Sequence, residues 1–273
     1  MIYSIFEQSL IALPLIFGAY ITLSLLKLPD FSLESAYLLG AVFAYLAKDL
    51  PLPLVILSSI AGGMTVGTIV FFLNQILKIP YLLAAIVTNG LIHGLTLFLL
   101  KGSVNGFSIA LPITEFTLLL IIFALTITIF LFLFASEMGY CFAIYGNNPQ
   151  FFDNHQISKK IVVLCGVLCG HGLASLSGFL FSLTNGVVDF TMNFGIIMLC
   201  LTSLMIGKLL KKGDRPNLIV PILGIIGYFL MQQVLLKIGL NLKYFNTFQA
   251  LFVLTILFIG KRKETYTLDH LGV

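Results

Sequence analysis

The chain has 273 residues, of which 59% are hydrophobic and 10% charged, and its mean hydropathy is +1.08. Soluble domains carry roughly 25% charged residues, and one soluble core of this length could not bury so much apolar surface. The net charge is +4, but the basic residues form short clusters between apolar runs, which indicates membrane topology rather than nucleic-acid binding. The composition therefore predicts an integral membrane protein.

The first apolar run, about 10–26, is predicted to be a span that is not cleaved. Residues Met1 to Gln8 contain no lysine or arginine, and no small-residue cleavage site follows the run. A secretory signal peptide would have a positively charged start and a cleavage site of small residues after its apolar run.

Further apolar runs follow along the chain, and a spanning helix needs roughly 20 such residues. They lie near 54–73, 81–100, 116–135, 161–183, 192–210, 218–236 and 244–260. A run near 35–47 is too short to span alone and is predicted to be part of a broken or tilted helix. Most runs are apolar all round, whereas β-barrel strands would alternate. We therefore predict an all-α, polytopic transmembrane bundle of about eight or nine spans, forming a single domain over residues 1–273.

The basic clusters predict which helix ends face the cytoplasm. The two richest clusters, within 208–215 and 261–263, are separated by two predicted spans, so both are placed inside. Lys159 and Lys160 place the segment 136–160 inside as well. The C-terminus is thus predicted to be cytoplasmic. The N-terminus lies outside if 35–47 crosses the membrane and inside if it does not.

Polar side chains within the predicted spans are few. Thr88, Asn89 and His93 form a set on one helix face, which predicts either a lining for a translocation path or hydrogen bonds between helices. The acidic residues near the spans, including Asp30, fall at predicted ends or loops. A proton- or sodium-driven carrier usually needs an ionisable group near the midplane, and none is evident. Catalysis by His93 or His171 would need a carboxylate that local spacing does not offer.

The segment 136–160 contains a turn signal, Gly146-Asn147-Asn148-Pro149. Asn148 and Pro149 can begin a short helix that carries Phe151 and Phe152. These rings are expected to be exposed to the cytosol unless something covers them. Two interpretations remain open: the segment lies on the bilayer surface, or it docks a soluble partner.

Small residues recur every four positions in the run 161–183, at Gly166, Gly170, Ala174 and Gly178. On a helix they form one ridge, along which a second helix can approach closely. Four residues turn the helix by roughly 400°, so the ridge drifts and its two ends are expected to contact different partners.

No cofactor, metal site or enzymatic activity is predicted. Cys165 and Cys169 share a helix face, but no histidine or acid lies beside them, so we interpret them as packing residues rather than a metal or redox pair. The sequence has no GxxxxGK[ST] phosphate loop, so any ATP hydrolysis belongs to a separate subunit.

Residues 139–158, followed by Gly170, Ala174, Ser177 and Gly178, resemble the permease subunits of bacterial ABC importers. The resemblance is to the inner-membrane translocators of branched-chain amino acid, ribose and tryptophan-type systems. The stretches 28–32 and 79–84 resemble two further family motifs, so the likeness covers about 28–210. Departures from the family pattern, which put the identity of the ATPase partner in doubt, are Ala143, Gln156, His171 and Lys208.

The resemblance implies that Gly146, Asn147, Asn148 and Pro149 match the family's coupling segment, which docks on the ATPase. With Phe151 and Phe152 they are the expected coupling residues. It also implies a dimer of two permease copies in the cytoplasmic (inner) membrane, two cytoplasmic ATPase subunits and an extracytoplasmic solute-binding protein. The expected function is ATP-driven import of a small polar solute, with an amino acid favoured over sugars and nucleosides. The alternative is a secondary carrier that does not depend on an ATPase.

Overall fold

The computed structural model describes residues 2–211, 217–239, 241 and 244–270. Lys212, Arg215 and Lys243 lie outside this part, as do the side chains of Lys261, Arg262 and Lys263. The sidedness that the basic clusters predict therefore stays a prediction.

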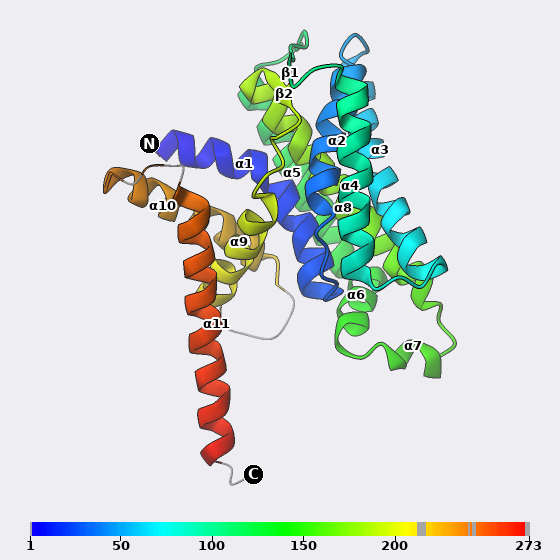
Figure 1. The fold of residues 1–273 in the computed structure, drawn as a ribbon, viewed down its shortest axis with the longest axis vertical. Coiled ribbons are helices and arrows are strands. Elements are labelled where there is room, and N and C mark those ends of the chain that lie inside the picture. Colours follow the sequence, from blue (N-terminus) through cyan, green and yellow to red (C-terminus); the bar gives the residue numbers. More distant parts are fainter. Residues whose placement is uncertain (1, 212–216, 240, 242–243, 271–273) are drawn as a thin grey trace.

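The chain folds into helices joined by short links (Figure 1). The first half contains α1 Ile2–Ala19, η1 Tyr20–Leu25, α2 Leu33–Leu46, α3 Leu52–Phe71, η2 Phe72–Ile76 and α4 Tyr81–Leu100. The second half contains α5 Glu115–Ala135, α6 Glu137–Asn147, α7 Gln150–Asn154, α8 Lys159–Asn185, α9 Ile196–Leu210, α10 Ile219–Lys237 and α11 Phe245–His270. Two short strands, β1 Val104–Gly106 and β2 Val187–Asp189, pair in antiparallel fashion. Both η1 and η2 are π-helical ends of the helices that precede them.

Six helices in the described part are long and apolar enough to cross a membrane. Counting the π-helical ends, they cover Tyr3–Leu25, Leu52–Ile76, Tyr81–Leu100, Glu115–Ala135, Lys159–Asn185 and Ile219–Lys237. The shorter apolar helices are Leu33–Leu46, Ile196–Leu210 and Phe245–Ile256. The prediction of an all-α, multi-pass membrane protein is confirmed, while the number of spans stays a prediction.

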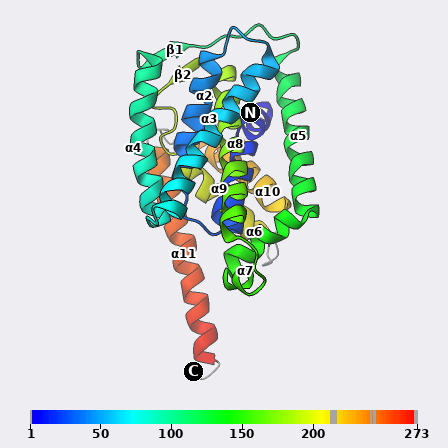
Figure 2. The same ribbon diagram turned by 90° about the vertical axis from the view of Figure 1, so that its right-hand side faces the viewer.

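Helix α8 lies at the centre of the bundle, packed against α1, α2 and α3 (Figure 2). Helices α4 and α5 flank this centre and expose large apolar side chains such as Phe98 and Phe132. An apolar surface of this kind suits contact with lipid, because the hydrocarbon chains of lipids offer no hydrogen-bond partners.

Local sequence explains most of the helix ends. Pro51 and Pro80 each precede the first residue of a helix, where the missing N–H removes no intrahelical bond. The residue that caps the end of α8 is Gly186, whose φ of +68° is a conformation that favours glycine. The links after η1 and η2 contain Lys27 and Lys78 with φ of 53° and 56°, so both lysines adopt the left-handed conformation.

Helices α6 and α7 lie at one end of the bundle, and β1 and β2 at the opposite end (Figure 1). Helix α8 connects these ends, since it begins at Lys159 after α7 and finishes at Asn185 before β2. Position along α8 therefore shows how far a residue that contacts it lies from each end of the bundle.

Candidate functional site

The predicted coupling segment forms two helices, α6 and α7, joined at Asn148 and Pro149. The expectation that both phenylalanine rings are exposed is wrong. Phe152 is fully buried, with its ring centroid 6.2 Å from that of Tyr145, and Phe151 is half-buried against the ring of His155. The rings fold back because the short helix turns its apolar face to α6.

The exposed part of the segment is polar. Asn147, Asn148, Pro149 and Gln150 are all exposed, and so are the residues from Asp153 to Ser158. Beside α6 lies an open groove of about 600 Å³, lined by Phe134, Gly139, Tyr140, Ala143, Ile144, Asn147 and Asn148. A soluble partner would therefore meet polar side chains and a groove rather than two projecting rings.

The end of α6 packs directly on the end of η1. The Cα of Gly146 lies so close to the Leu25 carbonyl that any Cβ at this position would overlap it. One residue on, the Oδ1 of Asn147 accepts a hydrogen bond of 2.7 Å from the Nζ of Lys27. The turn thus holds the start of the link between η1 and α2.

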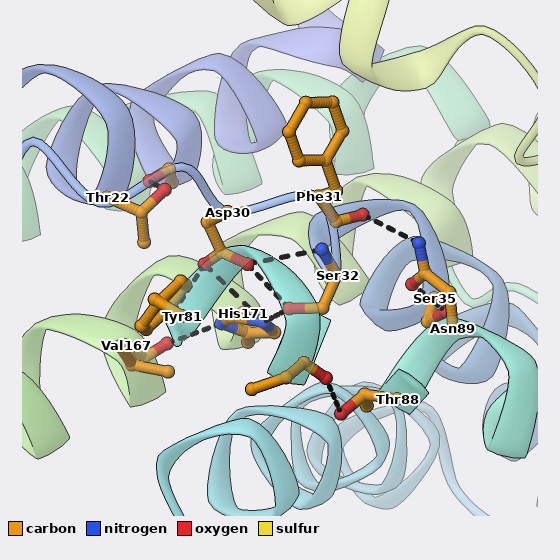
Figure 3. Close-up of polar contacts among 12 residues, drawn as sticks. Thr22, Asp30, Phe31, Ser32, Ser35, Tyr81, Thr88, Asn89, Val167 and His171 are labelled. Atoms are coloured by element: carbon orange, nitrogen blue, oxygen red, sulfur yellow. Dashed lines mark hydrogen bonds and ion pairs between the residues drawn. The ribbon is translucent and has the colours of Figure 1, made fainter. Parts of the chain in front are cut away.

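This link, residues 26–32, runs into the bundle and ends in a buried polar cluster (Figure 3). The carboxylate of Asp30 accepts hydrogen bonds from the backbone N–H of Ser32 (3.2 Å), the Ser32 hydroxyl (2.5 Å) and the Tyr81 hydroxyl (3.1 Å). Its Oδ2 lies 3.7 Å from Nε2 of His171. Asp30, Ser32 and His171 have no exposed surface.

The cluster lies beside the middle of α8, because His171 is 12 residues from the first residue of α8 and 14 from the last. An acid and a histidine thus lie inside the helix bundle, where sequence spacing shows no sign of an ionisable pair. Local spacing offers His171 no carboxylate, as predicted, but Asp30 reaches it from a remote part of the chain. Asp30 does fall between helices as predicted, but its side chain is buried.

Hydrogen-bond geometry limits the donor and acceptor roles in the cluster. Nδ1 of His171 lies 2.8 Å from the Val167 carbonyl, which can only accept, so Nδ1 carries a hydrogen. The Ser32 hydroxyl has one hydrogen and lies between Asp30 and Nε2 of His171, 2.8 Å from the latter. Ser32 can donate to Asp30 while Nε2 donates to Ser32, or donate to Nε2 itself. In either arrangement its hydroxyl bridges the acid and the histidine.

Thr88, Asn89 and His93 are not brought together. The Thr88 hydroxyl is buried and donates to Ala84 of its own helix. Asn89 donates to the carbonyl of Phe31 (3.0 Å) and accepts from Ser35, so it fastens α4 to the start of α2. The ring of His93 lies 5.7 Å from that of Phe190. A translocation path lined by all three side chains stays a prediction. Their separate positions do not favour it.

The small residues of α8 lie where other helices approach most closely. A Cβ on Gly166 would be 2.5 Å from a methyl of Leu26, and one on Gly170 would be 2.7 Å from the methyl of Thr22. A Cβ on Gly178 would overlap the Tyr37 carbonyl of α2, and Ala174 between them is fully buried. The ridge thus contacts the end of the first span at one end and α2 at the other.

Sequence reasoning missed the Asp30–His171 pair, although a signal was present. A histidine in the middle of a long apolar run needs a polar partner, because an unpaired polar group in hydrocarbon costs several kcal/mol. The sequence does not reveal that the partners come from a remote link. Ser32 in this link lies 139 positions before His171.

Comparison with known proteins gives three findings. A family model described as "Branched-chain amino acid transport system / permease component" matches residues 2–259. An uncharacterized protein of Rickettsia prowazekii is 29% identical over 251 residues, covering 86% of this chain and 89% of the relative. A protein of Clostridioides difficile named "Tyrosine transport system permease protein" is 31% identical over 218 residues, covering 77% of this chain and 74% of the relative. No solved structure matches.

Proposed function

Because this chain belongs to the family of permease components of branched-chain amino acid transport systems, we propose that it is the membrane-spanning subunit of an ATP-driven importer. The proposed importer passes an amino acid across the cytoplasmic (inner) membrane. A separate cytoplasmic ATPase supplies energy, an extracytoplasmic binding protein delivers the solute, and a second permease copy completes the path. The tyrosine-transport name of one relative supports an amino acid as the substrate.

One structural observation carries the proposal: the exposed turn at the end of α6 is packed on the segment that leads to the centre of the bundle. Gly146 packs on the Leu25 carbonyl, and Asn147 accepts a hydrogen bond from Lys27. Three residues after Lys27, the Asp30 carboxylate lies beside His171 in the middle of α8. Closure of two ATPase subunits beneath this turn would move α6 and the link together. Since α6 and α8 also contact each other, the movement would reach the central helix by two routes.

The docking surface differs from the one that the sequence suggested. With Phe152 buried, the ATPase would contact the exposed residues from Asn147 to Gln150 and the groove beside Tyr140. The two phenylalanines then act from within, holding α7 in one pose. A prefolded surface limits the ordering cost of docking.

A secondary carrier is the second candidate, and the buried Asp30–His171 pair favours it, because proton-driven carriers use ionisable groups near the midplane. Against it stands the enclosure of the pair: Asp30, Ser32 and His171 have no exposed surface. A carrier would need a route for protons to this fully buried site.

Uptake measurements separate the two candidates. Cells that express the chain with its ATPase and binding protein are supplied with radiolabelled tyrosine, leucine or a sugar. Importer function predicts uptake that stops when ATP is depleted with arsenate and continues when ionophores collapse the ion gradients. The opposite pattern would assign the chain to the secondary carriers.

A further inference from the structure

Two helices begin inside the bundle, level with the middle of α8, and meet at their first turns. Helix α2 begins directly after Ser32, which contacts His171. Helix α9 begins at Ile196, and its first turn is joined to α2 because the backbone N–H of Ile197 donates to the Glu34 carboxylate (3.2 Å). Negative charge is favourable at a helix N-terminus. The contact therefore holds Glu34 at a level away from both ends of α8.

The surface around this contact is exposed, although it lies within the span of α8. Glu34 is only partly buried and forms no ion pair with any described residue. The segment 190–195, which leads into α9, is not helical, and its residue Phe194 is 69% exposed. Hydrocarbon offers no hydrogen-bond partners, so an acid and irregular backbone at this level need protein or water beside them. Lipid is therefore a poor cover for this surface.

The neighbouring helix α4 adds further polar groups to the same surface. Asn89 bonds the start of α2, and the ring of His93 lies 5.7 Å from that of Phe190 in the segment before α9. The ring nitrogens of His93 have no hydrogen-bond partner within the part of the chain that the structure describes. We call Glu34, Asn89, His93 and Phe194 together the mid-level surface. It carries polar atoms that the single chain leaves unused.

Beside the mid-level surface, α4 has room for a close helix contact that the single chain does not make. A Cβ on Gly90 or Gly94 would have nothing within 4 Å. Every other glycine that the structure describes in the six long helices has an atom within 4 Å of such a Cβ. Glycines four apart on an apolar helix allow another helix to approach closely. The exposed side chains of Val87 and Leu91 adjoin them and supply apolar contact area.

A second copy of the chain fits this face. The mid-level surface carries both an acid, Glu34, and an imidazole, His93, so it is complementary to itself when a copy is turned about a two-fold axis. Figure 2 shows α4 and α5 on opposite flanks of the bundle. Helix α5 exposes large apolar side chains such as Phe132 and contains no glycine, so its flank suits lipid.

We propose that a second copy of the chain packs on the face formed by α4 and the mid-level surface. Gly90 and Gly94 lie at the helix contact, and the two copies enclose Glu34 beside the translocation path. This rests on the proposed function, which requires a second copy, and deepens it by assigning the face and the acid. Each copy contributes one carboxylate, so a single chain has only half of the path wall.

Photocrosslinking tests the face without any measurement of transport. p-Benzoylphenylalanine replaces Phe194, or Phe132 on α5, which is 77% exposed and therefore a matched control. Two copies with different affinity tags are expressed in the same membrane and irradiated. The probe at position 194 should give a crosslinked product that contains both tags. The probe at position 132 should react with lipid and give no such product.

Gly94→Ile tests the helix contact. The single chain should still fold, because a Cβ at this position meets nothing within 4 Å. The product with both tags should fall about tenfold or more, because a branched side chain keeps the two helices apart. Gly94→Ala keeps the residue small and should crosslink as the wild type does. Melting in detergent checks that both variants are folded.

Glu34→Gln tests the path. Crosslinking at position 194 should be unchanged, whereas ATP-driven uptake should fall about tenfold, because the path loses one charge from each copy. Glu115→Gln is the control, since Glu115 is exposed at the start of α5 on the opposite flank, and it should transport as the wild type does.

A product with both tags that is as abundant at 132 as at 194 would overturn the proposed face. So would a probe at 194 that reacts only with lipid or with a different protein, or an unchanged product in folded Gly94→Ile. Unchanged uptake in Glu34→Gln would overturn the placement of the path. Crosslinked copies without ATP-driven uptake would count against the importer function alone, and uptake without crosslinking at 194 against the face alone.

Discussion

Nε2 of His171 lies 2.8 Å from the hydroxyl oxygen of Ser32, a residue 139 positions earlier in the chain. This contact joins the link that follows the first span to the middle of the central helix. Because Ser32 also contacts Asp30, one hydroxyl lies between an acid and a base that are both out of reach of water. The stability of this region therefore depends on both partners being present.

Replacing one partner should be more harmful than replacing both. His171→Leu leaves the Asp30 carboxylate buried without its basic partner and should lower the free energy of unfolding by about 3–5 kcal/mol. The double variant Asp30→Asn, His171→Leu removes the charge as well and should recover most of this loss. Denaturant unfolding in detergent, with both single variants and the double variant, measures the coupling. Additive losses would show that the two side chains do not act as a pair.

The close approach of α8 and α2 should make Gly178 intolerant of any side chain. Gly178→Ala places a methyl group against the Tyr37 carbonyl and should lower both the yield and the melting temperature of the membrane-inserted protein. Gly90→Ala is the matched control, because nothing lies within 4 Å of a Cβ at that position of α4. There the substitution should stabilise the helix by about 0.5–1 kcal/mol. Equal melting temperatures for the two variants would contradict the packing argument.

Phe152 should contribute to folding of the α6–α7 segment rather than to direct contact with a partner. Phe152→Ala removes a fully buried ring and should cost about 3–5 kcal/mol of local stability. Hydrogen exchange of the amides in 137–154 is the measurement, and it should accelerate in this variant while the exchange of α8 is unchanged. Gln150→Ala, at an exposed position of α7, should leave the exchange of the segment as it is. Unchanged protection in Phe152→Ala would mean that the ring is not part of the packing.

The contact between Lys27 and Asn147 gives a test of coupling. Lys27→Met removes an exposed hydrogen bond, so the bundle should stay as stable as before within about 0.5 kcal/mol. If the turn transmits ATPase movement to the link, the variant should hydrolyse ATP normally but import fewer solute molecules for each ATP. Lys78→Met is the control, because Lys78 follows a π-helical end with the same left-handed backbone. Proteoliposomes that report hydrolysis and uptake together measure the ratio, and an equal ratio in both variants would exclude this route.

Apolar runs were sufficient to predict most helices. The run predicted at 81–100 matches α4, and the one at 116–135 differs from α5 by a single residue at its start. The run at 35–47, predicted to be too short to span alone, coincides closely with α2, Leu33–Leu46. Hydrophobic length predicts such elements because the bilayer sets it. The extension of the first helix to Ile2 and helix α6 were missed, since their residues are less uniformly apolar. The short helix predicted after Asn148 and Pro149 agrees with α7.

The polar site could not be predicted in the same way. Thr88 and Asn89 are adjacent in sequence, yet one bonds its own helix and the other reaches α2, because neighbouring positions point about 100° apart. Asp30 was placed correctly between two helices, but sequence spacing does not distinguish an exposed side chain of a link from a buried one. The burial of Phe152 follows from the fold of α7 against Tyr145, which no local pattern encodes.

The pairing of β1 with β2 restricts how the bundle can change shape. Val104, Asn105 and Gly106 pair with Asp189, Val188 and Val187, and these strands belong to the links after α4 and after α8. Those two helices are therefore tied together at the end remote from α7. Any tilt of α8 relative to α4 must either turn about this strand pair or break its hydrogen bonds. The bundle is thus hinged at one end, and the helix ends near α7 travel furthest in any rotation about that hinge.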